Sequence, residues 1–387
     1  MTSTTDLDAV AAVRALVPDI RAAADETERN RRPSPAIIQK LVDARLFDLI
    51  KPKSIGGIET DVMTMMHVIE EAAIGDASIG WCLGIGLGTS IMSGSVSEDV
   101  AREVFAPGLI PGGAFAPTGR AIPVDGGFRI TGRWQFASGS PHCSWFGAGS
   151  LVFDGDQPRM ISPEMPDWRM PLFPRADVEI IDTWHTGGMR GTGSHDIAVK
   201  DIFVPDERIV RMGAGEPVQS GPLYRYPIIG FLALTIAPVA TAIARHAIDE
   251  LVELAQKKVA LTTQKTVRDR AVPQHQIAEA EAELRAARAF MYEAAEEAWD
   301  VLTVGDPVSM RQRAMIRLSC VHATMASVKA TDIAYRLGGG TAVYETSVLQ
   351  RLMRDVHTIT QHVQLSPNNY EPVGRVLMGL DPGGMVF

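Results

Sequence analysis

The residue pattern of the chain changes twice, from helical to strand-like and back to helical, and this order limits the folds open to it. Residues 8 to 50 place Ala, Val, Leu and Ile among charges at helical spacing. From Ile110 to about Glu207, Gly and Pro clusters separate short alternating apolar runs, which is typical of a small β-barrel or sandwich. A polar, Gly-rich joint at 213 to 222 precedes a return to helical spacing. The sequence therefore predicts the order helices, sheet, helices.

Local patterns refine this prediction. The residues Asp125-Gly126-Gly127 lie between two alternating runs and predict a β-hairpin. In the second helical region, apolar residues recur at spacings of three and four, which predicts the seam of a long helix in a bundle. The seam positions are Ile277, Ala280, Leu284, Ala287, Met291, Ala294 and Ala298. Strands and helices do not alternate, and the Gly-rich stretch GGMRGTGSHD precedes a strand-like run, so a doubly wound nucleotide fold is excluded.

Composition narrows the class of protein. With 387 residues of which 46% are hydrophobic, the chain is expected to form two or three domains with large cores. A formal charge of -9 without a cluster of Lys and Arg argues against nucleic-acid binding. Three widely spaced cysteines and an N-terminus without an apolar core indicate a cytoplasmic protein. The uncharged runs 77 to 97 and 227 to 244 are interrupted by Gly, Ser or Pro, so we interpret them as buried helices rather than membrane spans.

Three short stretches suggest chemistry from their residue types alone. The stretch LMRDVHTITQH carries His357 and His362, which would point about 140° apart on a helix and cannot share a metal ion, so we expect no metal site. Aromatic residues bracket the strand-like WQFASG; they could fill a core or contact a flat cofactor ring, with backbone amides and Ser138 at its polar edge. Gly338 to Gly340 could end a helix or let the backbone approach a phosphate or ribose.

Four segments together resemble a known family. They are GGFRITGRWQFASGSPHCSWF, DTWHTGGMRGTGSHDIAVKDIFVP, RLGGGTAVYETSVLQRLMRDVHTITQH and GRVLMGLDP. Over nearly its whole length the chain is similar to the flavoprotein superfamily of acyl-CoA dehydrogenases, and more closely to its branch of two-component flavin-dependent monooxygenases, which hydroxylate aromatic or heteroaromatic compounds. The resemblance implies an α+β multidomain fold: an N-terminal α-helical domain at 1–109, a middle β-barrel domain at 110–212 and a C-terminal four-helix bundle at 213–387, assembled as a homotetramer.

The resemblance also implies a cofactor and a partner. Reduced flavin, FMN or FAD, is expected between the barrel and the bundle, and a separate flavin reductase is expected to supply it, because the chain has no nicotinamide-binding motif. Motif matches assign the following residues to cofactor binding: Trp134, Phe136, Ala137, Ser138, Gly139, Arg190, Thr192, Ser194, Gly339 and Gly340.

The position of His362 separates two branches of the superfamily. Many acyl-CoA dehydrogenases place Tyr-Glu-Gly there, and the glutamate removes a substrate proton; here Gln361, His362 and Val363 stand in that place. The monooxygenase branch is similar in having a histidine. An imidazole with an ordinary pKa of about 6.5 can move protons near neutral pH, so we predict that His362 assists proton transfer during oxygen insertion.

The small-molecule substrate is expected to be apolar. Relatives that hydroxylate phenols carry a histidine after a Gly-Trp pair, whereas GWCLGIGLGTSIMSG contains only small, apolar and hydroxyl residues. This difference favours an aromatic, heterocyclic or bulky hydrophobic compound. The predicted substrate contacts are Trp81, Leu83, Leu87, Met92 and His357.

Two other functions remain open at this point. One is a dehydrogenase that retains FAD and oxidises an acyl thioester with another group as base. The other is a catalytically silent scaffold that keeps the fold and its oligomer contacts.

Overall fold

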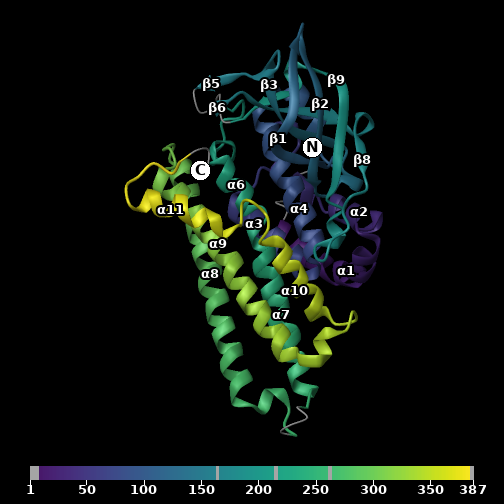
Figure 1. The fold of residues 1–387 in the computed structure, drawn as a ribbon, viewed down its shortest axis with the longest axis vertical. Helices are drawn as coiled ribbons and strands as arrows, with labels where there is room; N and C mark the ends of the chain where they lie inside the picture. The colour runs from purple at the N-terminus through teal and green to yellow at the C-terminus, as the bar shows by residue number, and fades with distance from the viewer. Residues whose placement is uncertain (1–7, 163–164, 213–216, 260–263, 384–387) are drawn as a thin grey trace. The chain divides into compact units, whose positions relative to one another are not determined.

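The computed structural model describes residues 8–162, 165–212, 217–259 and 264–383, which form two compact units (Figure 1). The first unit consists of Met1–Val68, Trp81–His185 and Arg190–Arg225. The second consists of Ile69–Gly80, Thr186–Met189 and Tyr226–Phe387. Most of the early helices thus share a unit with the sheet, and the later helices form the other unit. The domain boundaries predicted after residues 109 and 212 remain predictions.

The chain begins with short helices whose ends are set by local capping. At the start of α1 (Ala9–Asn30), a carboxylate oxygen of Asp8 accepts a 2.9 Å hydrogen bond from the backbone N–H of Ala11. Helix α2 (Pro35–Asp43) has proline at its first position, where the missing N–H has no helical partner to lose. The later helices of this region are α3 (Val62–Gly75), α4 (Ala77–Ser90) and α5 (Glu98–Phe105). The predicted helical start of the chain is confirmed.

The first unit contains one large sheet. Its strands are β1 (Pro111–Val124), β2 (Gly127–Ala137), β3 (Trp145–Asp154), β4 (Gln157–Pro158), β7 (Trp168–Pro174), β8 (Glu179–Ile181), β9 (His195–Pro205) and β10 (Ile209–Arg211). They are ordered β10-β7-β3-β1-β2-β9-β8, with β4 beside β3, while β5 (Met160–Ser162) pairs with β6 (Met165–Pro166) separately. Strands β1 and β3 run parallel and the other pairs of the large sheet are antiparallel.

The sheet confirms the predicted hairpin. Val124 of β1 pairs with Gly127 of β2, so Asp125 and Gly126 form a two-residue loop. At its outer edges the strand order ends at β10 and at β8, and no pairing in the described part of the chain joins these two strands. The central region is therefore a sheet domain whose path of strands is open.

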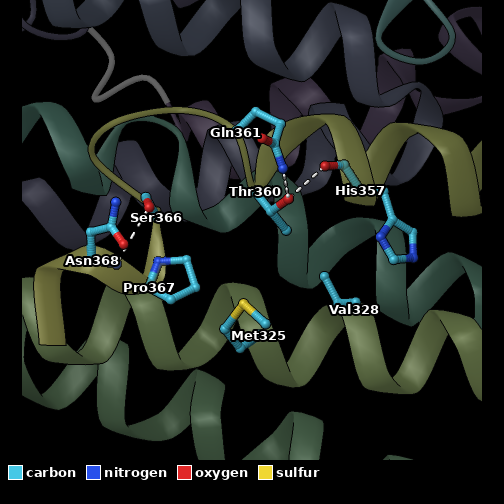
Figure 2. A pocket seen from close by; sticks show the side chains of 8 residues that line it. All are labelled: Met325, Val328, His357, Thr360, Gln361, Ser366, Pro367 and Asn368. Atoms are coloured by element: carbon cyan, nitrogen blue, oxygen red, sulfur yellow. Dashed lines mark hydrogen bonds between the residues drawn. The ribbon is translucent and has the colours of Figure 1, made fainter.

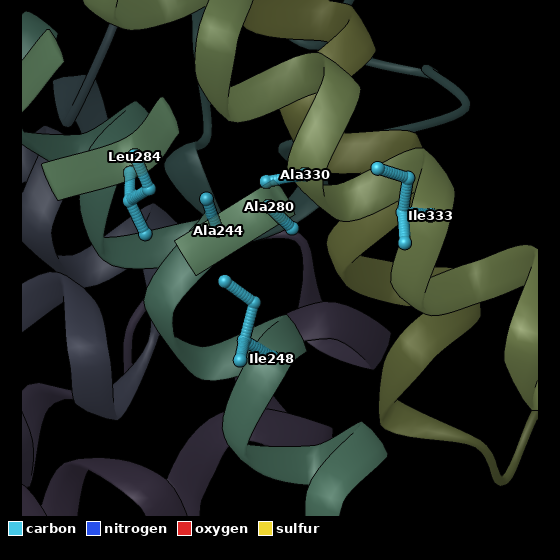
Figure 3. Close-up of a cluster of buried hydrophobic side chains, with 6 residues drawn as sticks. All are labelled: Ala244, Ile248, Ala280, Leu284, Ala330 and Ile333. Carbon is cyan, nitrogen blue, oxygen red and sulfur yellow. The ribbon is translucent and has the colours of Figure 1, made fainter. Parts of the chain in front are cut away.

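The second unit is built from helices, of which α7, α8, α9 and α10 run side by side, and α6 and α11 are short (Figure 1). They are α6 (Ile228–Leu234), α7 (Ala237–Lys257), α8 (Ala271–Thr303), α9 (Met310–Gly338), α10 (Val348–Ile359) and α11 (Tyr370–Leu377). Six of the seven predicted seam positions of α8 are buried, all except Ile277. Figure 3 shows a core cluster where small and branched side chains of α7, α8 and α9 meet: Ala244, Ile248, Ala280, Leu284, Ala330 and Ile333. The alanines let these helices approach closely.

A buried carboxylate ties three elements of the second unit together. Glu70 of α3 accepts hydrogen bonds from the Arg288 guanidinium at 2.6 to 3.0 Å, from the Tyr292 hydroxyl at 2.9 Å and from the Thr241 hydroxyl at 2.7 Å. Arg288 and Tyr292 lie on α8 and Thr241 on α7. Because every partner is a donor, the charge of Glu70 is compensated inside the unit.

One helical stretch is apolar and long enough to cross a membrane. It spans Ile228–Lys257, and 78% of its most apolar window is buried inside the protein. That extent of burial is typical of a core helix, in agreement with our interpretation of the run at 227 to 244.

Candidate active site

Strand β2 ends in a bulge that separates two aromatic side chains, one in the core and one exposed. The pairing of β2 with β9 shifts register between Trp134 and Ala137, and Phe136 adopts a left-handed backbone conformation with φ of 63°. Phe136 is 66% exposed, whereas Trp134 is 1% exposed. Trp134 donates a 2.5 Å hydrogen bond to the carbonyl of Gly149 within the sheet. Of the two predicted cofactor contacts, Phe136 therefore presents its ring outward, and Trp134 belongs to the core.

Three hydroxyl groups and one indole form a buried chain next to this bulge. The Ser194 hydroxyl lies 2.7 Å from the Ser138 hydroxyl and 2.6 Å from the Thr192 hydroxyl. Trp81 donates from Nε1 to the Ser138 oxygen at 3.0 Å. If Thr192 donates to Ser194 and Ser194 donates to Ser138, the Ser138 oxygen accepts two hydrogen bonds, from Ser194 and Trp81, and its own O–H remains a donor. The structure thus brings together Ser138, Thr192 and Ser194, three of the predicted cofactor contacts; their role in cofactor binding remains a prediction.

The backbone at the end of β2 is already hydrogen-bonded within the first unit. The Ser138 N–H donates to the carbonyl of Phe136 at 2.8 Å, and the Gly139 N–H donates to the carbonyl of Thr192 at 2.8 Å. Gly139 has φ of 76°, a conformation that favours glycine. These two amides therefore already have backbone partners, and the contact of Ser138 with a cofactor remains a prediction. Ala137 is fully buried beside them.

A tryptophan that the sequence did not single out lies against Phe136. The rings of Phe136 and Trp184 have centroids 6.2 Å apart and planes at 88°, an edge-to-face arrangement. The loop that carries Trp184 is fixed to the end of α1, because Arg31 donates to both carboxylate oxygens of Asp182 at 2.7 and 2.8 Å and to the Trp184 carbonyl at 3.1 Å. Trp184 lies inside a quoted motif, but its partner is 48 positions away, which spacing does not indicate.

Arg190 and the predicted substrate residues lie in different surroundings. The Arg190 Nε is 3.6 Å from a carboxylate oxygen of Glu28 in α1, and its side chain is 40% exposed. The predicted substrate contacts on and after α4 are all buried within the first unit: Trp81, Leu83, Leu87 and Met92. Among them, Trp81 contacts the hydroxyl chain through Ser138. The other three fill the apolar interior.

His362 follows the end of α10 and is held neutral. The backbone N–H of Gln364 donates to its ring Nδ1 at 3.2 Å, so the neutral imidazole carries its hydrogen on Nε2. Burial, and then the positive charge of Arg317, lower the pKa of His362 to about 4. The lowered pKa departs from the ordinary value of about 6.5 and favours the uncharged ring, whose Nε2 carries the hydrogen. The role of His362 in proton transfer remains a prediction.

His357 lies on a different side of α10 and lines a pocket (Figure 2). Its Nε2 is 2.9 Å from a carboxylate oxygen of Asp332 on α9. The pocket has a volume of about 450 Å³ and is lined by Met325, Val328, His357, Thr360, Gln361, Ser366, Pro367 and Asn368. His362 is not among these lining residues. Because α10 ends at Ile359, the prediction that both histidines lie on one helix is wrong for His362.

A short segment of the second unit is fastened to α10 by two neighbouring side chains. The carboxylate of Asp355 accepts a 2.5 Å hydrogen bond from the N–H of Met189, and Arg354 donates to the carbonyl of Gly187. A side chain at Gly188 would collide with the carbonyl of Arg354, so glycine is required for this approach. Part of the GGMRGTGSHD motif therefore serves contact with a helix.

The end of α9 places two exposed glycines beside a lysine. Gly339 caps the helix with φ of 52°, and Gly340 has open space around its Cα. Lys258 donates to the Gly338 carbonyl and, at 2.9 Å, to the Thr341 hydroxyl. This arrangement fits a helix cap and equally leaves Gly339 and Gly340 accessible to a ligand phosphate. No motif signalled Lys258, which lies 80 residues before Gly338.

Comparison with known proteins identifies the family. The model for acyl-CoA dehydrogenase, N-terminal domain, matches residues 6–109, and the model for acyl-CoA dehydrogenase, C-terminal domain, matches residues 234–367. An indole-3-acetate monooxygenase from Pseudomonas putida is 33% identical over 94% of this chain and 91% of its own length. The chain belongs to the acyl-CoA dehydrogenase superfamily.

Within this superfamily, the relatives are flavin-dependent monooxygenases. The oxygenase subunit HsaA of a flavin-dependent monooxygenase from Mycobacterium tuberculosis is 30% identical, over 99% of each chain. The solved structure of XiaF from Streptomyces sp., in complex with FADH2 and glycerol, has a TM-score of 0.90 and 27% identity, over 98% of this chain and 97% of that one. The predicted monooxygenase branch, the flavin dependence and the order of helical, sheet and helical regions are thereby confirmed. The individual binding residues remain predictions.

Proposed function

We propose that this chain is the oxygenase component of a two-component monooxygenase and hydroxylates an aromatic, heterocyclic or bulky hydrophobic small molecule with reduced flavin and O₂. The observation that carries this proposal is His362 at the position where many dehydrogenases of the superfamily have a glutamate, in a chain 33% identical to an indole-3-acetate monooxygenase. Without that carboxylate, the alternative of an acyl thioester dehydrogenase would need another group as its base. A separate reductase would supply the reduced flavin.

The residues at the end of β2 fit a flavin. Bound flavin supplies electrons and activates O₂. An isoalloxazine has a flat apolar body and a polar edge, and the exposed ring of Phe136 beside the hydroxyl of Ser138 offers a complement to each. Thr192 and Ser194 orient the Ser138 hydroxyl through the buried hydrogen-bonded chain. Gly339 and Gly340, exposed at the end of α9, are proposed to approach a phosphate of FMN or FAD.

His362 is proposed to act as a neutral hydrogen-bond donor. With Nδ1 occupied by the Gln364 N–H and a pKa of about 4, the ring stays neutral throughout the neutral range and carries its hydrogen on Nε2, the proposed donor to the ligand. Such a donor can stabilise negative charge that develops on oxygen without itself being charged beforehand. This role replaces the proton shuttle expected from an ordinary imidazole.

The substrate class follows from the residues around α4 and from the relatives. The stretch from Trp81 to Met92 contains no charged side chain and no histidine. The relatives include proteins named indole-3-acetate monooxygenase and p-hydroxyphenylacetate 3-hydroxylase, oxygenase component. We therefore propose an aromatic or heterocyclic ring, with His357 and its pocket as a second contact region.

The finer description of the protein belongs to the same proposal. It comprises a middle domain curved into a β-barrel, a C-terminal four-helix bundle, assembly as a homotetramer and a cytoplasmic location. Size-exclusion chromatography with light scattering tests the tetramer directly, since a monomeric mass would contradict it.

A labelling experiment tests the proposed reaction. The protein is mixed with chemically reduced FMN or FAD, ¹⁸O₂ and a panel of indoles, phenols and fused heterocycles, and the products are examined by mass spectrometry. We expect one ¹⁸O atom in the hydroxylated product of at least one panel member. Exclusive formation of hydrogen peroxide with every panel member and both flavins would contradict the proposal.

A further inference from the structure

The turn that follows α10 controls the ring of His362. The carbonyl of His362 accepts hydrogen bonds from Leu365 N at 2.9 Å and from Ser366 N at 3.0 Å, which closes the turn. Inside it, the N–H of Gln364 reaches the ring Nδ1 at 3.2 Å. The tautomer of the imidazole is therefore determined by backbone geometry, because a different turn would remove the donor from Nδ1.

Asn369 clamps this turn from one side. Its carboxamide nitrogen donates to the carbonyl of Val363 at 2.9 Å and to the carbonyl of Ser366 at 2.8 Å. Both N–H groups of the amide are thus used on the turn that contains Gln364. Asn369 is 7% exposed, so water does not readily replace these two hydrogen bonds.

Arg317 of α9 fixes the orientation of Asn369. Its Nη2 donates to the Asn369 side-chain oxygen, which leaves the amide nitrogen facing the turn. If the Asn369 amide rotated by 180°, its NH₂ group would face the Nη2 donor of Arg317. Both hydrogen bonds to the turn would then be lost. The two side chains therefore form one continuous support from α9 to the backbone around His362.

Burial of Arg317 lowers the stability of the fold, which indicates a role other than stability. It is 3% exposed, and no described residue accepts a hydrogen bond from its Nε or Nη1. No described carboxylate lies within ion-pair distance of it, and burial lowers its pKa to about 10. Taking an unpaired guanidinium out of water costs several kcal/mol, so an apolar side chain of similar length would be more stable there.

We propose that Arg317 and Asn369 are positioning residues that hold the turn 362–366 in the one conformation that fixes His362 as the Nε2–H tautomer. The consequence for the reaction rests on the proposed function, in which Nε2–H is the working donor. Arg317 is also the charged group that acts on the ring. Cys320, one turn further along α9, has its pKa raised to about 12 by burial and stays neutral.

Nuclear magnetic resonance of the ring nitrogens tests this directly, without any turnover. Full-length protein labelled with ¹⁵N-histidine is examined from pH 5.5 to 8, and His362→Gln identifies the signals. In the wild type we expect one protonated nitrogen, Nε2, and one unprotonated nitrogen, Nδ1, across the range. In Asn369→Ala the two shifts should move toward the average of both tautomers, and kcat/KM should fall roughly tenfold to a hundredfold.

Two variants of Arg317 separate its charge from its geometry. Arg317→Met removes both, so the tautomers should mix, and the pKa of His362 should rise only part of the way toward about 6.5, because burial is the larger cause of its lowering. Arg317→Lys keeps the charge without the planar fork, so the tautomers should mix while the ring stays neutral. The matched controls are Asn30→Ala, an exposed asparagine at the end of α1, and Arg311→Met, an exposed arginine on α9.

Unchanged ring shifts and an unchanged pKa of His362 in folded Asn369→Ala and Arg317→Met would overturn the inference. If Asn369→Ala fails to fold, the ring shifts of Arg317→Lys test the same loss of the fixed tautomer. Ring shifts that change as expected in a protein that hydroxylates nothing would leave the positioning role intact and refute the proposed function instead.

Discussion

Asp355 accepts a 2.5 Å hydrogen bond from the backbone N–H of Met189, a residue 166 positions earlier in the chain. Asp355 is 3% exposed and lies on α10, seven residues before His362. Met189 has φ of 50°, a left-handed conformation that is unfavourable for a long side chain. The hydrogen bond therefore holds a strained segment against the helix that leads to the candidate catalytic histidine.

Replacing Asp355 with asparagine should destabilise the protein by about 1.5–3 kcal/mol, because a charge-assisted hydrogen bond to a buried N–H is weakened. Urea unfolding followed by circular dichroism measures the effect. Glu371→Gln, an exposed change on α11, is the control and should alter stability by less than about 0.5 kcal/mol. Equal unfolding midpoints for the two variants would contradict the role of Asp355.

Replacing Glu70 with glutamine should destabilise the protein more than replacing Asp355 with asparagine. The Arg288 guanidinium would stay in place without its counter-charge, and breaking such a pair by removing one partner costs about 3–5 kcal/mol. The control is Glu253→Gln in the exposed pair with Lys257, which should cost less than about 1 kcal/mol. A similar midpoint of thermal unfolding for both variants would show that the Glu70 network carries little stability.

Substitutions of Phe136 can separate the effect of backbone strain on stability from the contribution of the ring to flavin binding. Because its φ of 63° suits glycine, Phe136→Gly should be more stable than Phe136→Ala by about 0.5–1 kcal/mol, the reverse of the usual order. Both variants should bind reduced flavin more weakly than the wild type, since each lacks the exposed ring. Anaerobic fluorescence titration and urea unfolding provide the two measurements. An alanine variant that is more stable than the glycine variant would refute the strained conformation.

Stability should depend on pH through His362 in a defined direction. The folded pKa of about 4 lies below the unfolded value of about 6.5, so the unfolded chain binds the proton first as pH falls. Between these two values, lowering the pH should destabilise the wild type relative to His362→Gln, and above about pH 7 the difference should be constant. His275→Gln, on an exposed face of α8, is the control. A difference in unfolding free energy that stays flat from pH 7 to 4.5 would contradict the lowered pKa.

Much of the fold could be predicted from the sequence because its signals are local. The Asp125-Gly126 loop and the spacing of three and four along α8 each depend on neighbours within one element. The site was less predictable where distant residues decide the outcome. Strand alternation would place Trp134 and Phe136 on one face, and the bulge that separates them has no glycine at position 136 to reveal it.

The same limit applies to the environment of His362. Residue type predicted a histidine of ordinary pKa, whereas the observed neutral ring depends on Arg317, 45 positions earlier, and on a turn clamped by Asn369. Neither residue has a spacing to His362 that any motif would flag. Trp184 was missed for the same reason, because only the fold brings it to Phe136.

The most direct test of the central claim is the rate at which reduced flavin is reoxidised by O₂ on this protein. In a stopped-flow experiment, FMN or FAD is reduced anaerobically, mixed with excess protein and then with oxygenated buffer, and the oxidised-flavin absorbance is followed. We predict that the absorbance returns far more slowly than without protein, and that His362→Gln moves the rate toward the protein-free value whereas Ser150→Ala does not. The same rate with and without saturating wild-type protein would contradict the claim that this chain binds reduced flavin and controls its reaction with oxygen.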